Sequence, residues 1–368
     1  MKTFKRALIA GLLLSAFTLV PASAQIPGGP SQPDKTIDAS ERQQVIDAMI
    51  KEMHKSYVFP EQAKKVEAVI RQRQKIGDYD AITSAEKLST TLTGHVFAQT
   101  RDKHLRMFYS AQPLPVEAKD KKPSAEEQAE FLASMKSQNF GVERVERLPF
   151  NIGYLDLRAF APAKGAAETL AAAMTLLAHT DSMIIDLRKN GGGDPATVTL
   201  LASYLLDERT HMTDIYYRNG DRTEQMWSSD VVPGARFGQK KDVYVLTSKH
   251  TFSAAEDFSY ALKGLQRITV VGETTGGGAH PGDVMRLNEH FAVFVPNGRS
   301  IGPVTNANWE GVGVAPDISV SAEDAFKTAQ IAILNKLAAS EKNPGKIDRI
   351  KARIAKVDGE NTAGTMAR

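Results

Sequence analysis

The stretch Met183-Ile-Ile-Asp-Leu-Arg-Lys-Asn-Gly-Gly-Gly-Asp194 decides the fold class. Its apolar start has the length of a buried strand and ends in a three-glycine turn, and residues 196–206 then have the composition of a helix. The same order recurs downstream, where a short turn connects residues 243–246 to residues 254–262. Strands that alternate with helices of this length predict a layered α/β core.

Outward from this core, the chain divides into segments of different composition. Apolar side chains recur at helical spacing three times before residue 100, which predicts a small N-terminal bundle. Residues 111–122 are polar and proline-rich, which is typical of a linker. The expected segments are a signal peptide at 1–24, a flexible lead-in at 25–37, an N-terminal helical domain at 38–110, a linker and helix at 111–143, a catalytic α/β core at 144–340 and an irregular C-terminal tail at 341–368.

The first 24 residues have the features of a secretory signal. Lys2, Lys5 and Arg6 precede an apolar run, and the small residues up to Ala24 form a cleavage site. The apolar run is shorter than the roughly 20 residues that span a bilayer, which disfavours an uncleaved anchor. We therefore expect cleavage after Ala24 and export to the periplasm or out of the cell.

The remainder of the chain has no net charge. Residues 1–24 contain three basic side chains and no acidic one, so cleavage leaves 43 Lys and Arg against 43 Asp and Glu. This balance gives no electrostatic reason to expect nucleic acid or an anionic membrane as a partner. We expect no nucleic-acid binding and no stable membrane association after signal cleavage, and the sequence does not indicate an oligomeric state.

Ser253 lies where the second strand–turn–helix unit begins its helix. A hydroxyl at such a junction can cap the helix by accepting a hydrogen bond from a free backbone N–H. It can also act as a nucleophile, because the positive end of the helix can stabilise an oxyanion. The position alone is compatible with both roles.

The glycine turn at 191–193 also has alternative interpretations. Consecutive glycines let the backbone approach a ligand, so that N–H groups point at a developing negative charge. A phosphate would fit such a loop, but the P-loop lysine and the G-x-G-x-x-G spacing are missing, which disfavours nucleotide binding. A plain tight turn is the third interpretation.

Five ordered motifs connect these elements to a known family. They are Asp102-Lys-His-Leu105, DLRKNGGGD at 186–194, TFSAAEDFSYALK at 251–263, VGETTGGGAHPG at 271–282 and NWEGVGVAPDI at 308–318. From about residue 40 to residue 338 the chain resembles the tail-specific protease superfamily of serine peptidases. Within it, the chain is most similar to the branch of the interphotoreceptor retinoid-binding protein and the core of tricorn protease. The resemblance implies a ClpP/crotonase-like spiral β-sheet core with outer helices, preceded by a small helical bundle.

The resemblance also implies a role for individual residues. Ser253 matches the nucleophile, His104 the general base and Glu310 the acid that orients the histidine. The backbone N–H groups of Gly191, Gly192 and Ala254 match the oxyanion hole. These roles agree with the chemistry of serine, which is a weak nucleophile until an adjacent base removes its proton. The implied activity is peptide-bond hydrolysis of a polypeptide substrate through an acyl-enzyme, without a cofactor or metal.

Two departures from the bacterial tail-specific proteases matter. Those enzymes use a Ser-Lys dyad whose lysine stands third after the G-E-T-T segment, where this chain has Gly278. They also contain a peptide-binding PDZ domain, for which residues 111–141 are too short. We therefore expect a histidine as the base and no PDZ domain.

Other candidate residues have weaker support. Asp102 could contact His104 or form a turn, and Glu256 could complement the dipole of the helix that follows Ser253. The histidines His250, His280 and His290 lack the spacing of paired metal ligands, so we expect them to be solvated or hydrogen-bonded.

Two alternative functions share these residues. A non-proteolytic serine hydrolase such as an esterase would use the same acyl transfer. A hydrophobic-ligand binding protein of the same fold, like the namesake of the branch, would have no need for Ser253, His104 and Glu310 together. The peptidase is therefore the first expectation.

Overall fold

A six-stranded sheet forms the centre of the molecule, whose computed structural model describes residues 32–115 and 124–359. In spatial order its strands are β12 (Ile318–Ser319), β8 (Thr269–Gly272), β7 (Asp242–Thr247), β4 (Ser182–Asp186), β3 (Ile152–Leu157) and β2 (Val142–Leu148). β2 runs antiparallel to β3, and all other neighbours are parallel. The predicted mixed α/β core is confirmed.

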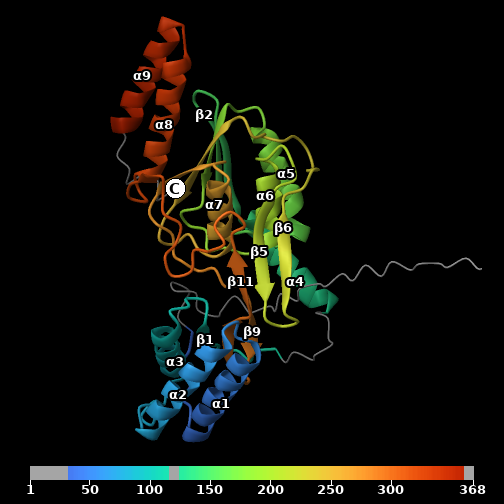
Figure 1. The fold of residues 1–368 in the computed structure, drawn as a ribbon, viewed down its shortest axis with the longest axis vertical. Coiled ribbons are helices and arrows are strands. Elements are labelled where there is room, and N and C mark those ends of the chain that lie inside the picture. The colour runs from blue at the N-terminus through green and yellow to red at the C-terminus, as the bar shows by residue number, and fades with distance from the viewer. Residues whose placement is uncertain (1–31, 116–123, 360–368) are drawn as a thin grey trace, which may run out of the picture.

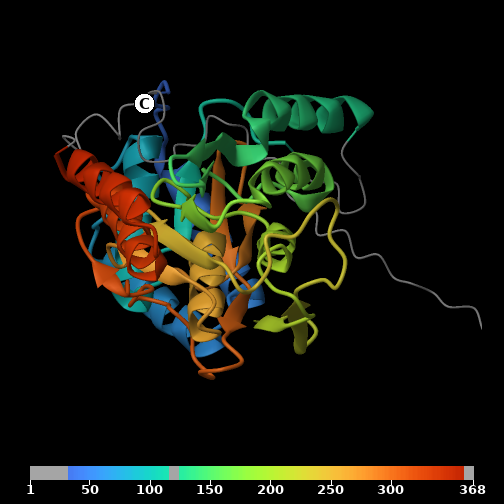
Figure 2. The same cartoon turned by 90° about the horizontal axis from the view of Figure 1, so that it is seen from above.

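Helices cover both faces of this sheet (Figures 1 and 2). Along β4, Met183 and Ile185 pack with the helices of one face, whereas Ile184 packs with those of the other. A strand that is buried on both faces must be apolar on both, which explains the continuous apolar run before Asp186. The first face carries α5 (Ala163–Leu177), α6 (Pro195–Ser203) and α7 (Ala254–Gly264), and the second carries α8 (Ala325–Ser340).

The order of the strands brings two loops together. β4 and β7 are adjacent and parallel, so the loops that follow their carboxyl ends leave the same edge of the sheet. The glycine turn follows β4, and Ser253 follows β7. Segments that are about 60 residues apart in sequence therefore meet at this edge.

A second sheet was not predicted from the sequence. It contains β11 (Gly298–Ile301), β5 (His211–Tyr217) and β6 (Arg222–Trp227), in that order, and all pairs are antiparallel. β6 is largely exposed and lacks the apolar alternation by which a half-buried strand is recognised.

The three predicted N-terminal helices are present as α1 (Ala39–Ser56), α2 (Pro60–Lys75) and α3 (Ala85–Thr100). After them, β1 (Arg106–Tyr109) pairs with β10 (Phe291–Pro296), which pairs with β9 (Gly282–Arg286). Apolar side chains of β10 share the buried cluster of the three helices. We call residues 32–115 together with β9 and β10 the N-terminal lobe (Figure 1). Residues 282–296 were expected in the core at 144–340, but they belong to this lobe.

The expected irregular tail is wrong for residues 344–359. They form α9 (Pro344–Gly359), which packs on α8 and buries Ile350 and Val357. Although the segment is highly charged, its apolar residues Ile347, Ile350, Ile354 and Val357 recur every three to four positions, which is the spacing of a one-sided helix.

Two helical segments directly precede β2 in the chain. α4 (Ala125–Ser137) and the 3₁₀ turn η1 (Asn139–Gly141) lead into β2. Within residues 32–115 and 124–359, no helix is both long and apolar enough to cross a membrane. The signal peptide expected at 1–24 lies outside the described residues, as do residues 116–123 and 360–368.

Candidate active site

Ser253 stands at a strained corner between β7 and α7. Its backbone has φ +55° and ψ −120°, a region that residues with a side chain rarely adopt. Strain of this kind is held in place by the surrounding structure and is concentrated at functional sites. A serine on a sharp strand-to-helix turn is also the arrangement that exposes a nucleophilic hydroxyl in other hydrolases.

The glycine turn packs directly against this corner. A Cβ at position 192 would lie 2.7 Å from Ser253 Cβ and 2.9 Å from Phe252 O, and Gly192 has φ +107°. Asn190 is fully buried and connects the two loops, because its O accepts from Phe252 N at 3.1 Å. Only glycine can occupy position 192 without displacing the serine.

The three expected oxyanion donors are not equivalent. The Gly192 N–H donates to Asn190 Oδ1 at 2.8 Å and is therefore already engaged. The Ala254 N–H is the first of α7 and, like those of Gly191 and Gly193, has no acceptor among the described residues. Free N–H groups at a helix start carry a positive partial charge, so Ala254 and its glycine neighbours can attract an oxyanion.

Glu256 is a completely buried connector. Its Oε2 accepts from Ser253 N at 2.9 Å and from Gly278 N at 2.8 Å, and its Oε1 accepts from Gly277 N at 2.6 Å and from the Thr275 hydroxyl. Burial raises the pKa of Glu256, and these hydrogen bonds oppose the rise. With both oxygens occupied, Glu256 fixes the segment 275–278 against the start of α7.

His104 reaches this segment from the N-terminal lobe. Its ring packs against Phe252 and Phe294, with centroid distances of 4.5 Å and 5.6 Å. A Cβ at position 278 would lie 2.7 Å from His104 Cε1, so the ring faces Gly278 closely. Burial lowers the pKa of His104 to about 4, which leaves the imidazole neutral at neutral pH.

Glu310 approaches the same segment from the loop before β12. Its Oε2 accepts from Ala279 N at 2.6 Å, and the neighbouring Trp309 Nε1 donates to Gly278 O at 2.7 Å. Burial is the main cause that raises the pKa of Glu310 to about 7. Glu310 Oε1 is buried and has no hydrogen-bond partner.

Ser253, His104 and Glu310 therefore surround one short segment, residues 275–280. Among the described residues, no hydrogen bond joins His104 to Ser253 or to Glu310. Four buried side-chain atoms in the described part of the chain lack a partner, and two of them are His104 Nδ1 and Glu310 Oε1. The imidazole nitrogen can donate and the carboxylate oxygen can only accept, so the two atoms are chemically complementary.

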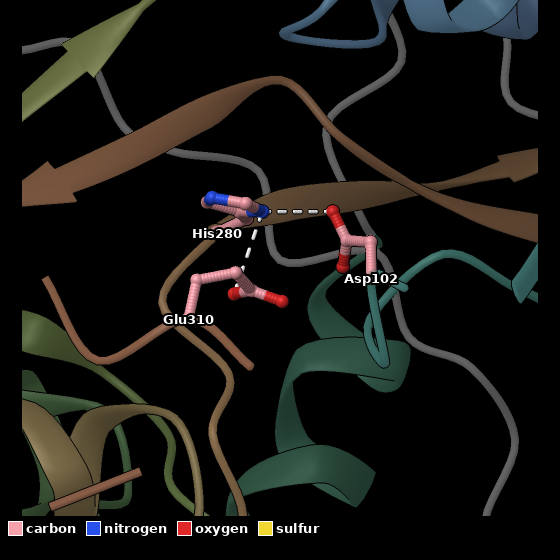
Figure 3. A group of neighbouring side chains, drawn as sticks. All are labelled: Asp102, His280 and Glu310. Carbon is pink, nitrogen blue, oxygen red and sulfur yellow. Dashed lines mark hydrogen bonds and ion pairs between the residues drawn. The ribbon is translucent and has the colours of Figure 1, made fainter. Parts of the chain in front are cut away.

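Asp102 and His280 form a network beside these residues (Figure 3). Asp102 is 1% exposed; its Oδ1 accepts from His104 N at 3.0 Å, and its Oδ2 accepts from the Tyr57 hydroxyl at 3.3 Å. His280 Nδ1 lies 2.8 Å from Asp102 Oδ2 and 3.4 Å from Glu310 Oε2. Asp102 thus forms a turn with the backbone of His104, and its side chain contacts His280, a contact that the sequence did not predict.

His280 is the site residue that sequence reasoning missed. The sequence predicts the same solvated or hydrogen-bonded role for the histidines at 250, 280 and 290, but their surroundings in the structure differ. His290 is paired with Ser110 O in the N-terminal lobe, and His250 is exposed. The available signal was the position of His280 two residues after Gly278, within the motif that carries the site segment.

Asp102, His280 and Glu310 could each offer one ligand atom to a metal ion, because these atoms lie within 4.8 Å of one another. The same positions are equally explained by an ion-pair network in which the imidazole stands between two carboxylates.

Comparisons with known proteins identify a related family and related folds. The family model described as peptidase family S41 matches residues 151–320, and the model for its N-terminal domain in eukaryotic IRBP matches residues 39–143. A candidate peptidase from Parabacteroides merdae is 21% identical, with a TM-score of 0.55, over 79% of this chain and 96% of that one. A lipoprotein from Streptococcus agalactiae is 12% identical, with a TM-score of 0.54, over 82% and 97% of the two chains. The two structures share the fold.

Proposed function

The chain belongs to peptidase family S41 and is a serine peptidase, and we propose that it hydrolyses polypeptides through an acyl-enzyme on Ser253 with His104 and Glu310 completing a triad. The observation that carries this proposal is the pair of buried, unpartnered and complementary atoms, His104 Nδ1 and Glu310 Oε1. Burying a polar atom without a partner is unfavourable, so a catalytic role gives these two a reason to remain unpaired in the free enzyme.

In the proposed mechanism, Nδ1–H of His104 donates to Glu310, which leaves Nε2 as the basic nitrogen. Nε2 takes the proton of the Ser253 hydroxyl as Oγ attacks the substrate carbonyl carbon. The carbonyl oxygen becomes an oxyanion, and the N–H groups of Ala254 and of the glycine turn stabilise it. Collapse of the intermediate expels the amine, which receives the proton from His104, and water then hydrolyses the acyl-enzyme by the same steps. A neutral His104 is the protonation state that this first step requires.

The space around Gly278 supports histidine rather than lysine as the base. A Cβ at this position would lie 2.2 Å from Phe252 Cζ and 2.7 Å from His104 Cε1. A lysine at position 278, as in the dyad of the bacterial tail-specific proteases, would therefore need the space that the phenylalanine and the imidazole fill. The two arrangements exclude each other, so the base in this chain comes from the N-terminal lobe.

A fluorophosphonate probe tests the nucleophile and the base. The purified protein should be labelled covalently, whereas Ser253→Ala and His104→Ala should be labelled at background level. Ser134→Ala and His54→Gln, at outer positions of α4 and α1, are matched controls that should keep the wild-type labelling rate. Labelling of Ser253→Ala at the wild-type rate would refute the proposal.

A substrate comparison separates the peptidase from its alternative. A denatured protein and a short-chain ester would be given side by side to wild type and to Ser253→Ala. We expect serine-dependent cleavage of the protein. Turnover of the ester alone would favour the non-proteolytic hydrolase, because both use the same acyl transfer. If neither is turned over by folded wild-type protein, the hydrophobic-ligand binding protein becomes the better explanation.

We also propose that the chain is exported after cleavage behind Ala24, on the evidence of its first 24 residues. Expression of the full chain in a bacterial host, followed by intact-mass measurement of the exported fraction, should give a protein that starts at Gln25. A mature mass that retains residues 1–24 would contradict cleavage.

A further inference from the structure

His280 lies at the joint between the N-terminal lobe and the core. It follows the segment 275–278, to which Ser253 is tied through Glu256, and it precedes β9, the first strand that the later chain contributes to the lobe. Its side chain is 7% exposed, and its ring packs edge-on against Phe59 of the lobe at 5.1 Å. One imidazole therefore contacts both parts of the molecule.

The imidazole stands between two carboxylates of low exposure (Figure 3). A single Nδ1–H can donate to one oxygen at a time, and the 2.8 Å distance identifies Asp102 as its acceptor. The 3.4 Å distance to Glu310 is an electrostatic contact. Two carboxylates this close repel each other unless a donor or cation lies between them, and His280 occupies that place.

The consequence at Glu310 is a fixed orientation of its carboxylate. Ala279 N and His280 Nδ1 both face Oε2, and this leaves Oε1 as the oxygen without a partner. Oε1 is the atom that the proposed triad assigns to His104.

The consequence at Asp102 concerns the base. Asp102 Oδ2 is held by His280 and the Tyr57 hydroxyl, while Oδ1 accepts the backbone N–H of His104. The contacts thus run without a gap from the backbone of His104, through Asp102 and His280, to the carboxylate of Glu310. The base belongs to the lobe and the acid to the core, so this chain of contacts spans the joint.

We propose that His280 is a positioning residue that aligns His104 with Glu310. It does so by bridging Asp102 and Glu310 across the joint between the lobe and the core. The inference rests on the proposed triad. His280 touches neither the substrate nor the hydroxyl of Ser253 in this role. Its contribution is to align the base with its acid before substrate arrives, and misplacement of a catalytic group by about 1 Å can cost about 10²-fold in rate.

The test compares two replacements of His280 by steady-state kinetics on a peptide substrate. His280→Leu removes the bridge, and we expect kcat to fall by about 10²-fold with little change in KM, because alignment and not substrate binding is lost. His280→Asn places an amide N–H near the position of Nδ1, so it should recover part of the lost kcat. If His280 acted through packing alone, kcat would not depend on whether the replacement carries an N–H donor.

A matched control uses another histidine–carboxylate pair. His54 Nε2 lies 2.6 Å from Glu67 Oε2 in the helical bundle, away from the site, and His54→Leu should keep the wild-type kcat. Circular dichroism and thermal melting would establish that each variant is folded. If His280→Leu does not fold, Asp102→Asn breaks the same bridge from the other side and should lower kcat in the same way.

The outcomes separate this inference from the proposed function. Folded His280→Leu with the kcat of wild type would overturn the bridge, and so would His280→Asn that is no faster than His280→Leu. In both cases loss of probe labelling in Ser253→Ala and His104→Ala would leave the triad standing. Unchanged labelling of Ser253→Ala would refute the proposed triad and therefore also the bridge.

Discussion

Gly278 shows how one missing side chain makes room for the proposed base, His104. Its N–H donates to Glu256 and its carbonyl accepts from Trp309, so the backbone at this position is fixed from both sides. The imidazole of His104 and the ring of Phe252 fill the space where a Cβ would project. A replacement therefore cannot be absorbed by backbone movement and must displace the aromatic side chains.

We predict that Gly278→Ala lowers kcat/KM by about 10²-fold, because the added methyl group pushes the His104 ring out of line with Ser253. The measurement is peptide hydrolysis together with the rate of fluorophosphonate labelling. Gly94→Ala is the matched control, since a Cβ at position 94 of α3 would meet no atom within 4 Å. This control should keep full activity and stabilise the helix by up to about 1 kcal/mol. Wild-type kinetics of Gly278→Ala would show that the ring has room to move.

The pH dependence of the reaction should report Glu310. Burial and the negative charge of Asp102 raise the pKa of Glu310 to about 7, while His280 opposes the rise. His104, whose pKa is lowered to about 4, is neutral above that pH. The carboxylate must be ionised to receive Nδ1–H, so kcat/KM should increase with pH through about 7 and then level off.

This profile would be measured from about pH 5 to about pH 9, because kcat/KM reports the ionisation of the free enzyme. In Glu310→Gln the residual activity should be low and lack the step near neutrality, since no acid remains to titrate at that position. A wild-type profile that is flat across neutrality, or a step that persists in Glu310→Gln, would contradict the assignment.

At the scale of single elements, α7 contains a buried carboxyl group, that of Asp257, which lowers the stability of the protein at neutral pH. Asp257 is buried in its first turn, where its Oδ1 accepts from the Thr213 hydroxyl at 2.5 Å. Burial raises the pKa of Asp257 from 3.8 to about 6. The folded protein thus binds a proton that the unfolded chain has lost between these two values, so stability falls as pH rises through this window.

We predict that Asp257→Asn stabilises the protein at neutral pH. A shift from 3.8 to about 6 corresponds to about 3 kcal/mol, which is the upper bound for the gain in the free energy of unfolding. Below about pH 4 both forms are neutral, and the gain should disappear. Urea denaturation at the two pH values measures it, and Asp358→Asn on the exposed side of α9 is the control. If the gain in the free energy of unfolding were equal at both pH values, the ionisation of Asp257 would not be its cause.

Elements were predictable where one side of a segment is apolar. The four inner strands of the central sheet (β3, β4, β7 and β8) and the N-terminal helices follow from apolar runs and helical spacing, because burial selects those residues. β6 was missed because it is largely exposed and its side chains carry no such pattern. α9 was missed for a different reason, since its charge concealed four apolar residues at helical spacing.

For the candidate site, the sequence indicates individual residues, whereas their connections appear only in the structure. Ser253 and the glycine turn follow from parallel strands that end at one edge. The engagement of Gly192 N–H by Asn190 and the bridge through His280 depend on contacts between segments far apart in the chain. Spacing along the sequence carries no information on such contacts, so only the folded arrangement reveals them.

At the scale of the whole molecule, the lobe that carries the proposed base is completed by two strands from the later part of the chain. After His280 the chain leaves the core as β9 and β10, of which β10 pairs with β1, and it returns at β11. Phe291, Val293 and Val295 of β10 are buried in the cluster formed by the three N-terminal helices. The two parts therefore cannot be separated by cutting the chain once. These shared strands connect the proposed base in the lobe to the proposed nucleophile in the core.

This arrangement predicts that residues 32–115 do not fold cooperatively by themselves. Burial of each of the three β10 side chains contributes about 2 kcal/mol, so their loss is comparable to the whole stability of a small domain, about 5–15 kcal/mol. Thermal melting followed by circular dichroism should show a broad transition for this fragment. The same fragment joined to residues 281–297 through a flexible linker should melt sharply, and the fusion with Val293→Asp, as a matched control, should not. Sharp melting of residues 32–115 alone would mean that these residues form an independent domain. The position of His104 relative to the core would then depend on side-chain contacts at the joint and not on shared strands.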